Sequence, residues 1–391
     1  MKKAVIVSYA RTPIGSFMGS LSSYSAPELG SFAIKAALTR ANIDPASVDE
    51  VIMGNVLTAG VGQAPARQAA KFAGLPNHVP ATTIGKVCGS GLKAVMLAAQ
   101  AVSLGDAEVV IAGGMESMSN APYALPQARR GYRLGNATMI DTMVNDGLWD
   151  VYNNYHMGSA AELCAKECNV SRKLQDDFAI ESYKRAQKAQ STGKFTNEIV
   201  PVEIKDRKGN VTVITEDEEP KSVQFDKIPT LKPVFDKNGT VTAANASSIN
   251  DGAAALLIMS EDKAKELGCT PIATITGYTQ AAREPEWFTL APADALTKLS
   301  EKLSMSLQDV DLFEINEAFS VVSVAVNQKL GLNPSQVNIY GGAVSLGHPI
   351  GASGARVLIT LLSALVQENK KTGMASLCIG GGEAVALGVQ R

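Results

Sequence analysis

The chain of 391 residues repeats part of its own pattern, and this repeat constrains its fold more than any other feature. The run SVDEVIMG at 47–54 is echoed by DVDLFEIN at 309–316, an offset of 262. Two later landmarks repeat with offsets of 263 and 267, namely 89–95 with 352–358 and 110–116 with 377–383. Nearly constant offsets over three landmarks predict two copies of one structural unit.

Helix and strand patterns alternate within each copy. Residues 33–41 have helical spacing, and 109–112 form a short apolar run typical of a buried strand. The sequence therefore predicts an α/β protein with two duplicated halves. Residues 119–250 depart from the repeat, and we expect them to form an inserted loop domain with a charged, turn-rich stretch. Its basic cluster at 129–133 is read equally well as a ligand contact or as a solvated face.

A glycine-rich turn at 341–354, GGAVSLGHPIGASG, carries one histidine, His348. Glycine lets backbone and ligand approach closely, and Pro349 stiffens the turn. Because an imidazole moves protons near neutral pH, His348 is a candidate general base, and we expect the glycines to leave it exposed. The alternative is a structural turn histidine.

Two cysteines have glycine neighbours. Cys88 precedes residues 90–102, an apolar run of helix formers, and should therefore lie at a helix N-terminus, where N–H groups and the helix dipole favour a thiolate. Cys378 lies in LCIGGG and can act as a base only if its pKa falls near the working pH. For both, the alternative is a small buried hydrophobe. The repeat aligns Cys88 with Gly351, just past His348, so these groups should face each other across a pseudo-twofold axis.

Together with Asn316-Glu317-Ala318-Phe319, these segments resemble the thiolase family, and the resemblance runs from Ala4 to the C-terminus. It implies the thiolase fold: two duplicated α/β halves in five layers with an inserted loop domain. The expected boundaries are 1–118 with 251–270 for the N-terminal half, 119–250 for the loop domain and 271–391 for the C-terminal half.

The resemblance also implies a reaction, the reversible condensation of two acetyl-CoA molecules to acetoacetyl-CoA and free coenzyme A through an acetyl-cysteine. Cys88 would be the nucleophile, His348 its base, and Cys378 the base that removes the α-proton. Asn316 would hold a water that, with His348, binds the thioester oxygen. The N–H groups of Cys88 and Gly380 would form a second oxyanion hole. The neighbouring Glu317 is expected to be a structural hydrogen-bonding group rather than an acid.

Further positions match those that contact the thioester in short-chain acetoacetyl-CoA thiolases. In that group His156 would meet the pantetheine arm and Met157 would narrow the acyl pocket, which implies small substrates, while Lys227 would lie near the phosphates. The full set is Leu148, His156, Met157, Tyr183, Lys227, Phe235, Ser247, Ala318 and Phe319.

The resemblance implies no tightly bound cofactor, but it does imply potassium activation. Positions that hold potassium in the potassium-activated mitochondrial-type enzymes, mostly through main-chain oxygens, are matched by Tyr183, Ala243, Ala244, Ala246 and Val344. The alternative is an ordinary loop with a packed tyrosine, since oxygen coordination needs no distinctive side chain.

The sequence departs from the family pattern at three positions. Gly85 replaces a residue that is usually Asn, Ser or Thr, and Ser222 stands where an arginine lies near the adenine, with Lys221 as a possible substitute. Glu383 follows the terminal glycines and could raise the pKa of Cys378 by like-charge repulsion, unless it points away or is paired.

Composition narrows the function classes. A formal charge of −2 gives no case for binding nucleic acid or an anionic membrane, and the apolar runs look too short to span a bilayer. Five cysteines, an odd number, indicate reduced thiols, and Cys164 with Cys168 is expected to pack rather than bind metal. A strand-like run directly after Met1-Lys2-Lys3 leaves no room for a leader, so we expect a cytoplasmic protein.

Two rival functions remain open at this stage. One is a longer-chain 3-ketoacyl-CoA thiolase of fatty acid degradation, and the other is a non-catalytic binding or scaffolding protein. A condensing enzyme that uses acyl carrier protein is less favoured, because Cys378 as a second thiol base is a thiolase trait. By analogy with the family we expect a homotetramer, a dimer of dimers joined through the inserted loop, acting in lipid metabolism.

Overall fold

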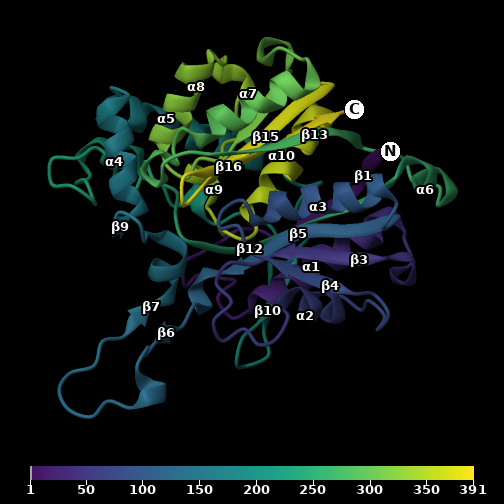
Figure 1. Ribbon diagram of the computed structural model, residues 1–391, viewed down its shortest axis with the longest axis horizontal. Coiled ribbons are helices and arrows are strands. Elements are labelled where there is room, and N and C mark those ends of the chain that lie inside the picture. Colours follow the sequence, from purple (N-terminus) through teal and green to yellow (C-terminus); the bar gives the residue numbers. More distant parts are fainter. Residues whose placement is uncertain (1) are drawn as a thin grey trace.

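The computed structural model describes residues 2–391. Its central feature is a ten-stranded mixed sheet (Figure 1). In spatial order the strands are β14 (Leu312–Ile315), β15 (Thr372–Ile379), β16 (Glu383–Gln390), β13 (Ala273–Ala282), β1 (Ala4–Arg11), β12 (Asn250–Ser260), β5 (Val109–Ser117), β3 (Glu50–Gly54) and β4 (Ala81–Ile84), with the short β2 (Gly15–Ser16) paired to β12.

The strand pairing confirms the internal duplication. In the first half β3 runs parallel to β5, which is antiparallel to β12, and in the second half β14 runs parallel to β15, which is antiparallel to β16. The halves join between β1 and β13, where Val5 faces Thr274 and Ile6 faces Ala273. The outer strand β4 has only a single parallel bridge, Phe313 with Val337, as its counterpart in the second half.

Helices fill the centre and cover both outer faces, giving the five layers expected from the sequence. Between the halves lie α3 (Ser90–Leu104) and α10 (Ser353–Gln367), which pack against each other and against strands of both halves. The outer face of the first half carries α1 (Ala26–Ala41) and α2 (Pro65–Phe72), and that of the second carries α7 (Ala291–Leu303) with α8 (Ser320–Leu330) beside it (Figure 1).

The two central helices approach closely at their N-termini because both carry glycine there. A Cβ on Gly91 would lie 2.7 Å from the Ala355 nitrogen, and one on Gly354 would lie 2.2 Å from the Leu92 nitrogen. Neither distance is tolerated by a real side chain. The crossing therefore brings the segments before α3 and before α10 together, and these segments carry Cys88 and His348.

One apolar segment contradicts the expectation that all such runs are too short to cross a membrane. Residues Val87–Leu104 have the length and a mean hydropathy of 1.4 that would allow a span. Their composition has another cause in this fold, because α3 is the central helix and packs against α10, β3, β5 and β12. Leu92, Val95 and Val102 on it are fully buried.

Residues 119–250 form the remaining elements, apart from the short helices α6 (Glu261–Glu266) and α9 (Ala343–Leu346). They comprise α4 (Met157–Glu167), α5 (Arg172–Ser191), a π-helical turn (Met143–Leu148) and the ladders β6–β7 (Tyr123–Ala124, Ile140–Asp141), β8–β9 (Trp149–Asp150, Tyr155–His156) and β10–β11 (Val202–Lys205, Val211–Ile214).

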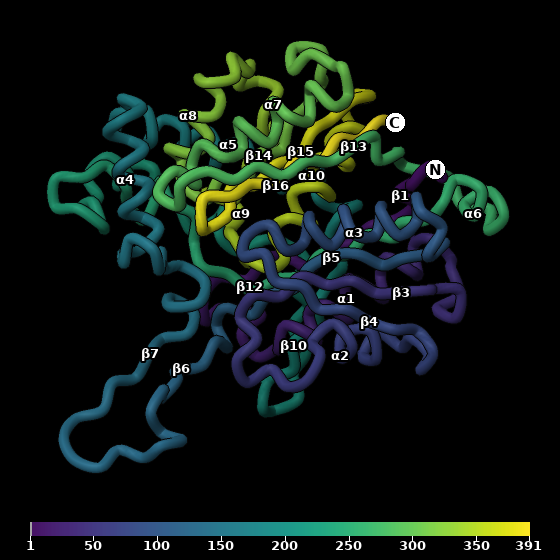
Figure 2. Tube along the Cα trace, viewed as in Figure 1, coloured from purple at the N-terminus to yellow at the C-terminus, as the bar shows by residue number. Residues whose placement is uncertain are grey.

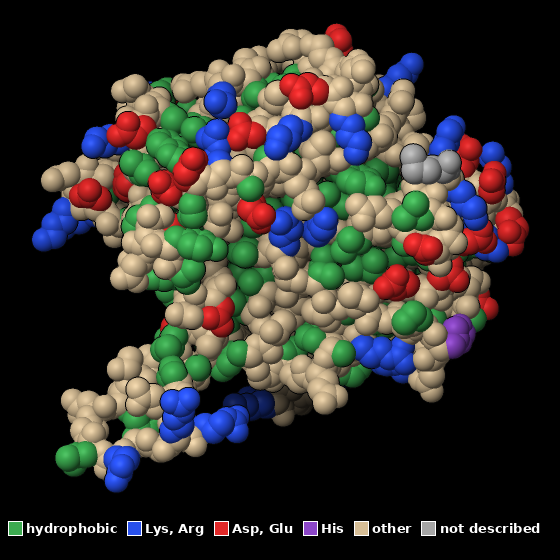
Figure 3. Space-filling model, viewed as in Figure 1, with side chains coloured by type: hydrophobic (Ala, Val, Ile, Leu, Met, Phe, Trp, Pro, Cys, Tyr) green, Lys and Arg blue, Asp and Glu red, His purple; other side chains and the backbone are tan. Residues whose placement is uncertain are grey.

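The ladder β6–β7 is the base of an arm that projects far from the body, as the trace in Figure 2 shows. Residues 125–139 at its tip are exposed. The basic residues of the 129–133 cluster lie here in solvent contact, and Figure 3 shows Lys and Arg side chains gathered on this arm. In the single chain the cluster is thus a solvated face.

Candidate active site

A pocket of about 550 Å³ opens where the N-terminal ends of the central helices meet the inserted segment. It brings together most of the residues that the sequence singled out for chemistry and for thioester contacts. Those lining it are Cys88, Leu148, His156, Met157, Phe235, Ala243, Ala246, Ser247, Ala318, Phe319, His348 and Gly380.

Cys88 lies between β4 and α3, two residues before the helix begins. The preceding Val87 has φ 43°, a left-handed conformation that is rare for a β-branched residue and typical of strained functional turns. The N–H groups of Cys88 itself and of Gly380 lower the pKa of the thiol, and both residues line the pocket, so both predicted oxyanion donors belong to it.

The sequence prediction that Cys88 favours the thiolate is wrong for the free site. Burial raises the pKa of the Cys88 thiol to about 11, and the charge of Glu116 adds to this, although the N–H groups of Gly380 and Cys88 lower it. Removal from water penalises the charged form more than two backbone donors and a helix N-terminus stabilise it. The resting nucleophile is therefore a protonated thiol.

Cys378 lies on β15 behind the pocket and is fully buried. Burial raises its pKa well above the ordinary value, and a Cys88 thiolate would raise it further. Glu383 does not add to this effect, because its carboxylate is paired with Lys86 Nζ at 2.6 Å. The pairing that the sequence left open as an alternative is therefore present.

His348 is buried, with 5% of its surface exposed, so the expectation that the surrounding glycines expose it is wrong. The missing side chain at Gly347 leaves room for Asn250, because a Cβ on Gly347 would lie 2.5 Å from it. Asn250 Oδ1 then accepts a hydrogen bond from the backbone N–H of His348 at 2.9 Å. Burial, followed by the charge of Arg356, lowers the His348 pKa to about 3. The imidazole is neutral at physiological pH.

Hydrogen bonds fix the tautomer of His348. Its Nδ1 lies 2.6 Å from Ser353 Oγ, whose hydroxyl donates to the Pro349 carbonyl at 2.9 Å. Since that hydroxyl proton is already used, we assign the imidazole proton to Nδ1, donating to Ser353. Nε2 then carries the lone pair and faces Asn316 Nδ2 at 3.5 Å. Asn316 directly follows β14, as the sequence predicted, and its Oδ1 has no protein partner within residues 2–391.

One buried carboxylate, that of Glu317, holds the loops around these groups. Glu317 accepts from Ser182 Oγ at 2.7 Å, Asn338 Nδ2 at 2.8 Å and the Val344 N–H at 3.1 Å, in keeping with the structural role expected for it. Burial raises its pKa.

Glu116 was missed by the sequence reasoning, because a carboxylate within an apolar strand carries no local motif. It accepts from Asn55 Nδ2 at 2.6 Å, from two neighbouring N–H groups at 3.1 Å and from the Gly351 N–H at 2.9 Å. It thereby ties the turn after His348 to the first half. Burial raises its pKa to about 7, against the lowering effect of these donors.

Aromatic and apolar side chains form the walls of the pocket. His156 stacks on Phe235 with ring centroids 4.7 Å apart, and Phe235 meets the edge of Phe319 at 6.3 Å. Gly158 is required beneath this stack, since a Cβ there would lie 2.2 Å from the Phe235 ring. Met157 is 7% exposed, and its sulfur lies 3.8 Å from the position a Cβ on Gly380 would take. Met157 thus narrows the space beside the Gly380 N–H.

Several predicted residues do not line the pocket, among them Asn316, Cys378 and Val344. Lys227 is exposed, and Tyr183 packs against Val344 and Ala179 beneath it, while Ala244 is buried in the adjoining turn. Lys221, the substitute considered for the missing arginine at 222, is paired with Glu216.

Sequence reasoning also missed several wall residues, because most of them come from loops that carry no recognisable motif. They include Ser16, Phe17, Met118, Gly147, Glu219, Val234, Thr242, Ser248, Ile249, Phe288 and Ile350.

Cys164 and Cys168 belong to the core rather than to a site. Their sulfurs are 3.8 Å apart on α4, and Cys164 is fully buried. Within residues 2–391, no cluster of three or more His, Cys, Asp or Glu side chains is arranged to hold a metal ion, and all five cysteines are free thiols.

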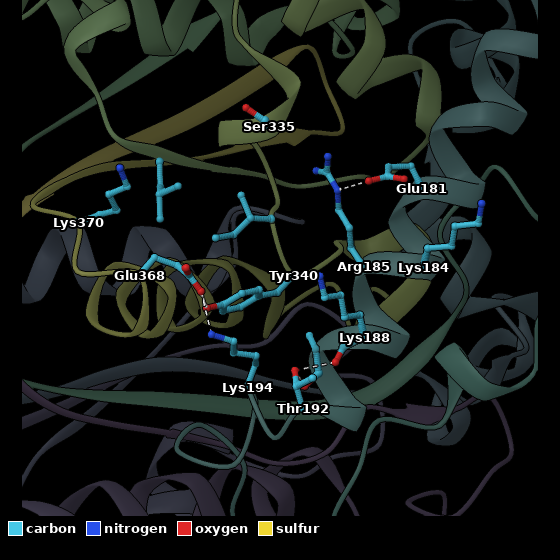
Figure 4. Close-up of a pocket in the computed structure, with 13 residues that line it drawn as sticks. Glu181, Lys184, Arg185, Lys188, Thr192, Lys194, Ser335, Tyr340, Glu368 and Lys370 are labelled. Carbon is cyan, nitrogen blue, oxygen red and sulfur yellow. Dashed lines mark hydrogen bonds and ion pairs between the residues drawn. The ribbon is translucent and has the colours of Figure 1, made fainter.

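A second cavity, of about 610 Å³, lies elsewhere, between α5, the end of α10 and residues 335–340 (Figure 4). Its walls are mostly charged, and Lys194 pairs with Glu368 at 2.8 Å in it. Its lining contains none of the reactive groups described above.

The duplicated five-layer fold, with two thiols, an imidazole and an amide converging on one pocket, defines a class of acyl-transfer proteins. The sequence matches the family description "Thiolase, N-terminal domain" over residues 4–262 and "Thiolase, C-terminal domain" over 269–391. The chain belongs to the thiolase family.

Three relatives and one solved structure specify the likeness further. The chain is 56% identical to an acetyl-CoA acetyltransferase of Cupriavidus necator (100% of both chains) and 55% identical to acetyl-CoA acetyltransferase 2 of Arabidopsis thaliana (98% of this chain, 95% of the relative). It is 52% identical to a cytosolic acetyl-CoA acetyltransferase of Gibberella zeae (98% and 97%). A thiolase from Ascaris suum, solved in complex with coenzyme A, superposes with a TM-score of 0.95 at 43% identity over both full chains.

Proposed function

We propose that the protein is an acetyl-CoA C-acetyltransferase that condenses two acetyl-CoA molecules reversibly to acetoacetyl-CoA and coenzyme A. The observation that carries this proposal is the convergence of Cys88, His348 and the Gly380 N–H on one pocket, with Cys378 directly behind it. Relatives that share half or more of their residues with the whole chain bear that activity in their names.

In the first half-reaction Cys88 attacks the thioester carbonyl of acetyl-CoA. His348 Nε2, which carries the free lone pair, takes the thiol proton and passes it to the departing coenzyme A sulfur. The oxygen of the tetrahedral intermediate accepts hydrogen bonds from the Cys88 and Gly380 N–H groups, which point to one position. The products are an acetyl-cysteine and free coenzyme A.

In the second half-reaction a second acetyl-CoA enters the same pocket. Cys378 gives its thiol proton to His348 Nε2 and then, as a thiolate, removes the α-proton, so the enolate oxygen lies against the protonated His348 Nε2 and the Asn316 amide. The enolate carbon then attacks the acetyl group on Cys88, so the carbon–carbon bond forms as the carbon–sulfur bond breaks. The departing Cys88 sulfur takes back the proton held by His348, and Cys378 keeps the α-proton, so both thiols return to their neutral forms.

Met157, His156 and the ring stack define a short acyl space, which favours four-carbon products over those of a longer-chain 3-ketoacyl-CoA thiolase. The test is the loss of acetoacetyl-CoA absorbance on addition of coenzyme A, for the parent, for Cys88→Ala and for Cys168→Ala as a control outside the site. We expect rapid loss for the parent and the control only. Faster turnover of eight- to ten-carbon substrates would identify the longer-chain enzyme, and no turnover by a folded parent would refute the proposal.

Coenzyme A contacts are assigned to the inserted segment, with Ser247 and Leu148 in the pocket wall along the pantetheine and Lys227, outside the pocket, toward the phosphates. Ser247 is held by its bond to the Ala318 carbonyl at 2.9 Å. We also propose the division expected from the family resemblance: an N-terminal half at 1–118 with 251–270, a loop domain at 119–250 and a C-terminal half at 271–391.

Potassium activation is part of the proposal. The residues fit such an ion: the Tyr183 hydroxyl and the main-chain oxygens of Ala243 and Ala244 accept no hydrogen bond from residues 2–391, and Tyr183 packs on Val344. Together with the main-chain oxygen of Ala246, which also lines the pocket, these oxygens would hold potassium. The charge of the bound ion would stiffen the adjoining loop. Equal rates in potassium and sodium buffers would refute this part.

We further propose a cytoplasmic homotetramer acting in lipid metabolism. The projecting arm exposes Tyr123, Leu134 and Met139 by 63%, 100% and 63%, and the outermost strand β4 is half-buried with one unpaired edge. Exposed apolar groups and open strand edges are typical of interfaces. The five free thiols suit a reducing compartment. A monomer mass by light scattering would refute the assembly.

A further inference from the structure

Two loops meet at the Cys88 sulfur, one from each half of the molecule. The first, residues 85–89, joins β4 to α3, and the second, residues 380–382, joins β15 to β16. They meet at the wall of the pocket, which both Cys88 and Gly380 line, and there the Gly380 N–H lowers the pKa of the Cys88 thiol. Because the two loops are almost 300 residues apart in the chain, nothing in local sequence fixes their separation.

Neither loop is rigid by its own composition. Residues 380–382 are all glycine, with φ of 91° at Gly381 and 85° at Gly382, and Val87 in the other loop has the unfavourable φ of 43°. Such conformations persist only where surrounding contacts over-determine them. Apolar contacts between the loops are present, since Gly89 packs on Ile379 and Val87 lies next to Gly380.

One ion pair also joins these loops. Lys86 Nζ lies 2.6 Å from Glu383 Oε2, with side-chain exposures of 19% and 39%, and no other ion pair within residues 2–391 connects the two segments. Both backbones are themselves anchored: the Lys86 N–H donates to Ser90 Oγ at 2.8 Å, and Glu383 pairs with Ile379 and Ala282 in the sheet. The pair therefore links a point two residues before Cys88 to a point three residues after Gly380.

We propose that the Lys86–Glu383 ion pair is a positioning device that holds the Cys88 loop against the Gly380 loop and so keeps the Gly380 N–H within hydrogen-bonding reach of the Cys88 sulfur. Lys86 and Glu383 touch no substrate in this role. The consequence for turnover rests on the proposed function, since Gly380 serves there as an oxyanion donor. Displacements of about 1 Å at such donors lower rates by about a hundredfold.

A purely electrostatic role of the ion pair predicts different changes in the Cys88 pKa. The direction of each change therefore separates an electrostatic role from a positioning role. The charged groups near this region are Lys86, Glu383 and Lys93, and Glu116 acts on the Cys88 thiol as well. If only charge mattered, removing the Lys86 charge would raise the Cys88 pKa and removing the Glu383 charge would lower it. If position matters, both changes weaken the Gly380 hydrogen bond, and both raise the pKa.

The experiment measures alkylation of Cys88 by iodoacetamide, read by mass spectrometry of the Cys88 peptide, at fixed pH. Below the thiol pKa the rate follows the thiolate fraction, so one pKa unit is about tenfold in rate. We expect Lys86→Met and Glu383→Met each to react about three- to tenfold more slowly than the parent, and Lys86→Glu with Glu383→Lys to recover to within about twofold. Faster or unchanged alkylation of Glu383→Met would overturn the proposal.

A matched control comes from the Lys194–Glu368 pair in the second cavity, which has a similar length of 2.8 Å and exposures of 30% and 38% (Figure 4). Lys194→Met and Glu368→Met should alkylate at the parent rate. Melting temperatures of all variants separate a loss of positioning from a loss of folding. Because the Glu383 side chain is 39% exposed, we expect its variants to fold. Turnover is measured alongside: if the parent lacks thiolase activity, the proposed function fails, while the alkylation series still decides the role of the pair.

Discussion

Shortening Met157 to alanine should lengthen the substrates that the pocket accepts. Met157 is 7% exposed and lies beside the position of the Gly380 N–H, so its terminal atoms occupy the space into which a longer acyl chain would extend. Deleting Cγ, Sδ and Cε makes room for about two methylene groups, and each buried CH₂ contributes about 0.8 kcal/mol. A six-carbon 3-ketoacyl-CoA should gain about 1.6 kcal/mol over acetoacetyl-CoA, a shift of about 15-fold in relative kcat/KM.

The assay is thiolysis of four-, six- and eight-carbon 3-ketoacyl-CoA substrates by the parent, by Met157→Ala and by Met305→Ala. Met305 is half-buried outside the pocket, so its truncation controls for a general loss of packing. Only the Met157 variant should change the ratio of six- to four-carbon kcat/KM. An unchanged ratio in a folded Met157→Ala protein would refute the reasoning, because it would mean that another wall sets the acyl length.

Three further predictions follow from buried groups. Because the pKa of Cys88 is about 11 and that of His348 about 3, alkylation of Cys88 in the free protein should keep rising through pH 9.5, and a plateau below pH 8 would instead show a thiolate–imidazolium pair. Asn316→Ala should slow condensation about a hundredfold but exchange of coenzyme A into acetyl-CoA much less; equal losses would place Asn316 in the first half-reaction. The Glu116 pKa is raised from 4.5 to about 7 on folding, so its contribution to stability is fully present below pH 4.5 and is lost by about 3 kcal/mol as the pH rises to 7. Urea unfolding of Glu116→Gln at pH 5 and pH 7 should lack that difference, and an identical pH slope in both proteins would contradict it.

Sequence predicted the parts of this molecule that local pattern determines. The repeat predicted the duplicated sheet, and the apolar run after Cys88 predicted the central helix with the cysteine before its N-terminus. The motifs also predicted that Cys88 and His348 meet, because the repeat aligns the segments before α3 and before α10 and their glycines allow the two helices to cross closely.

Properties that depend on distant contacts were not predictable in this way. Burial of His348 depends on Asn250, which fills the space left by Gly347, and the pairing of Glu383 depends on Lys86, 297 residues earlier. The direction of the Cys88 pKa likewise reflects competition between desolvation and two backbone donors, and a sequence shows only the donors.

The corrected protonation states change how the site must work. Two thiols and one imidazole, all neutral, form a resting site without a standing ion pair; Cys378 and His348 are buried and Cys88 is half-buried. Charge then develops only when a thioester is present to receive it, and the groups that stabilise it, the Cys88 and Gly380 N–H groups and the Asn316 amide, are already fixed in place. In a site largely closed to water, preorganised neutral donors stabilise a developing oxyanion without a cost of reorganisation. Precise spacing of the two loops at Cys88 therefore matters more to this enzyme than an activated thiolate at rest.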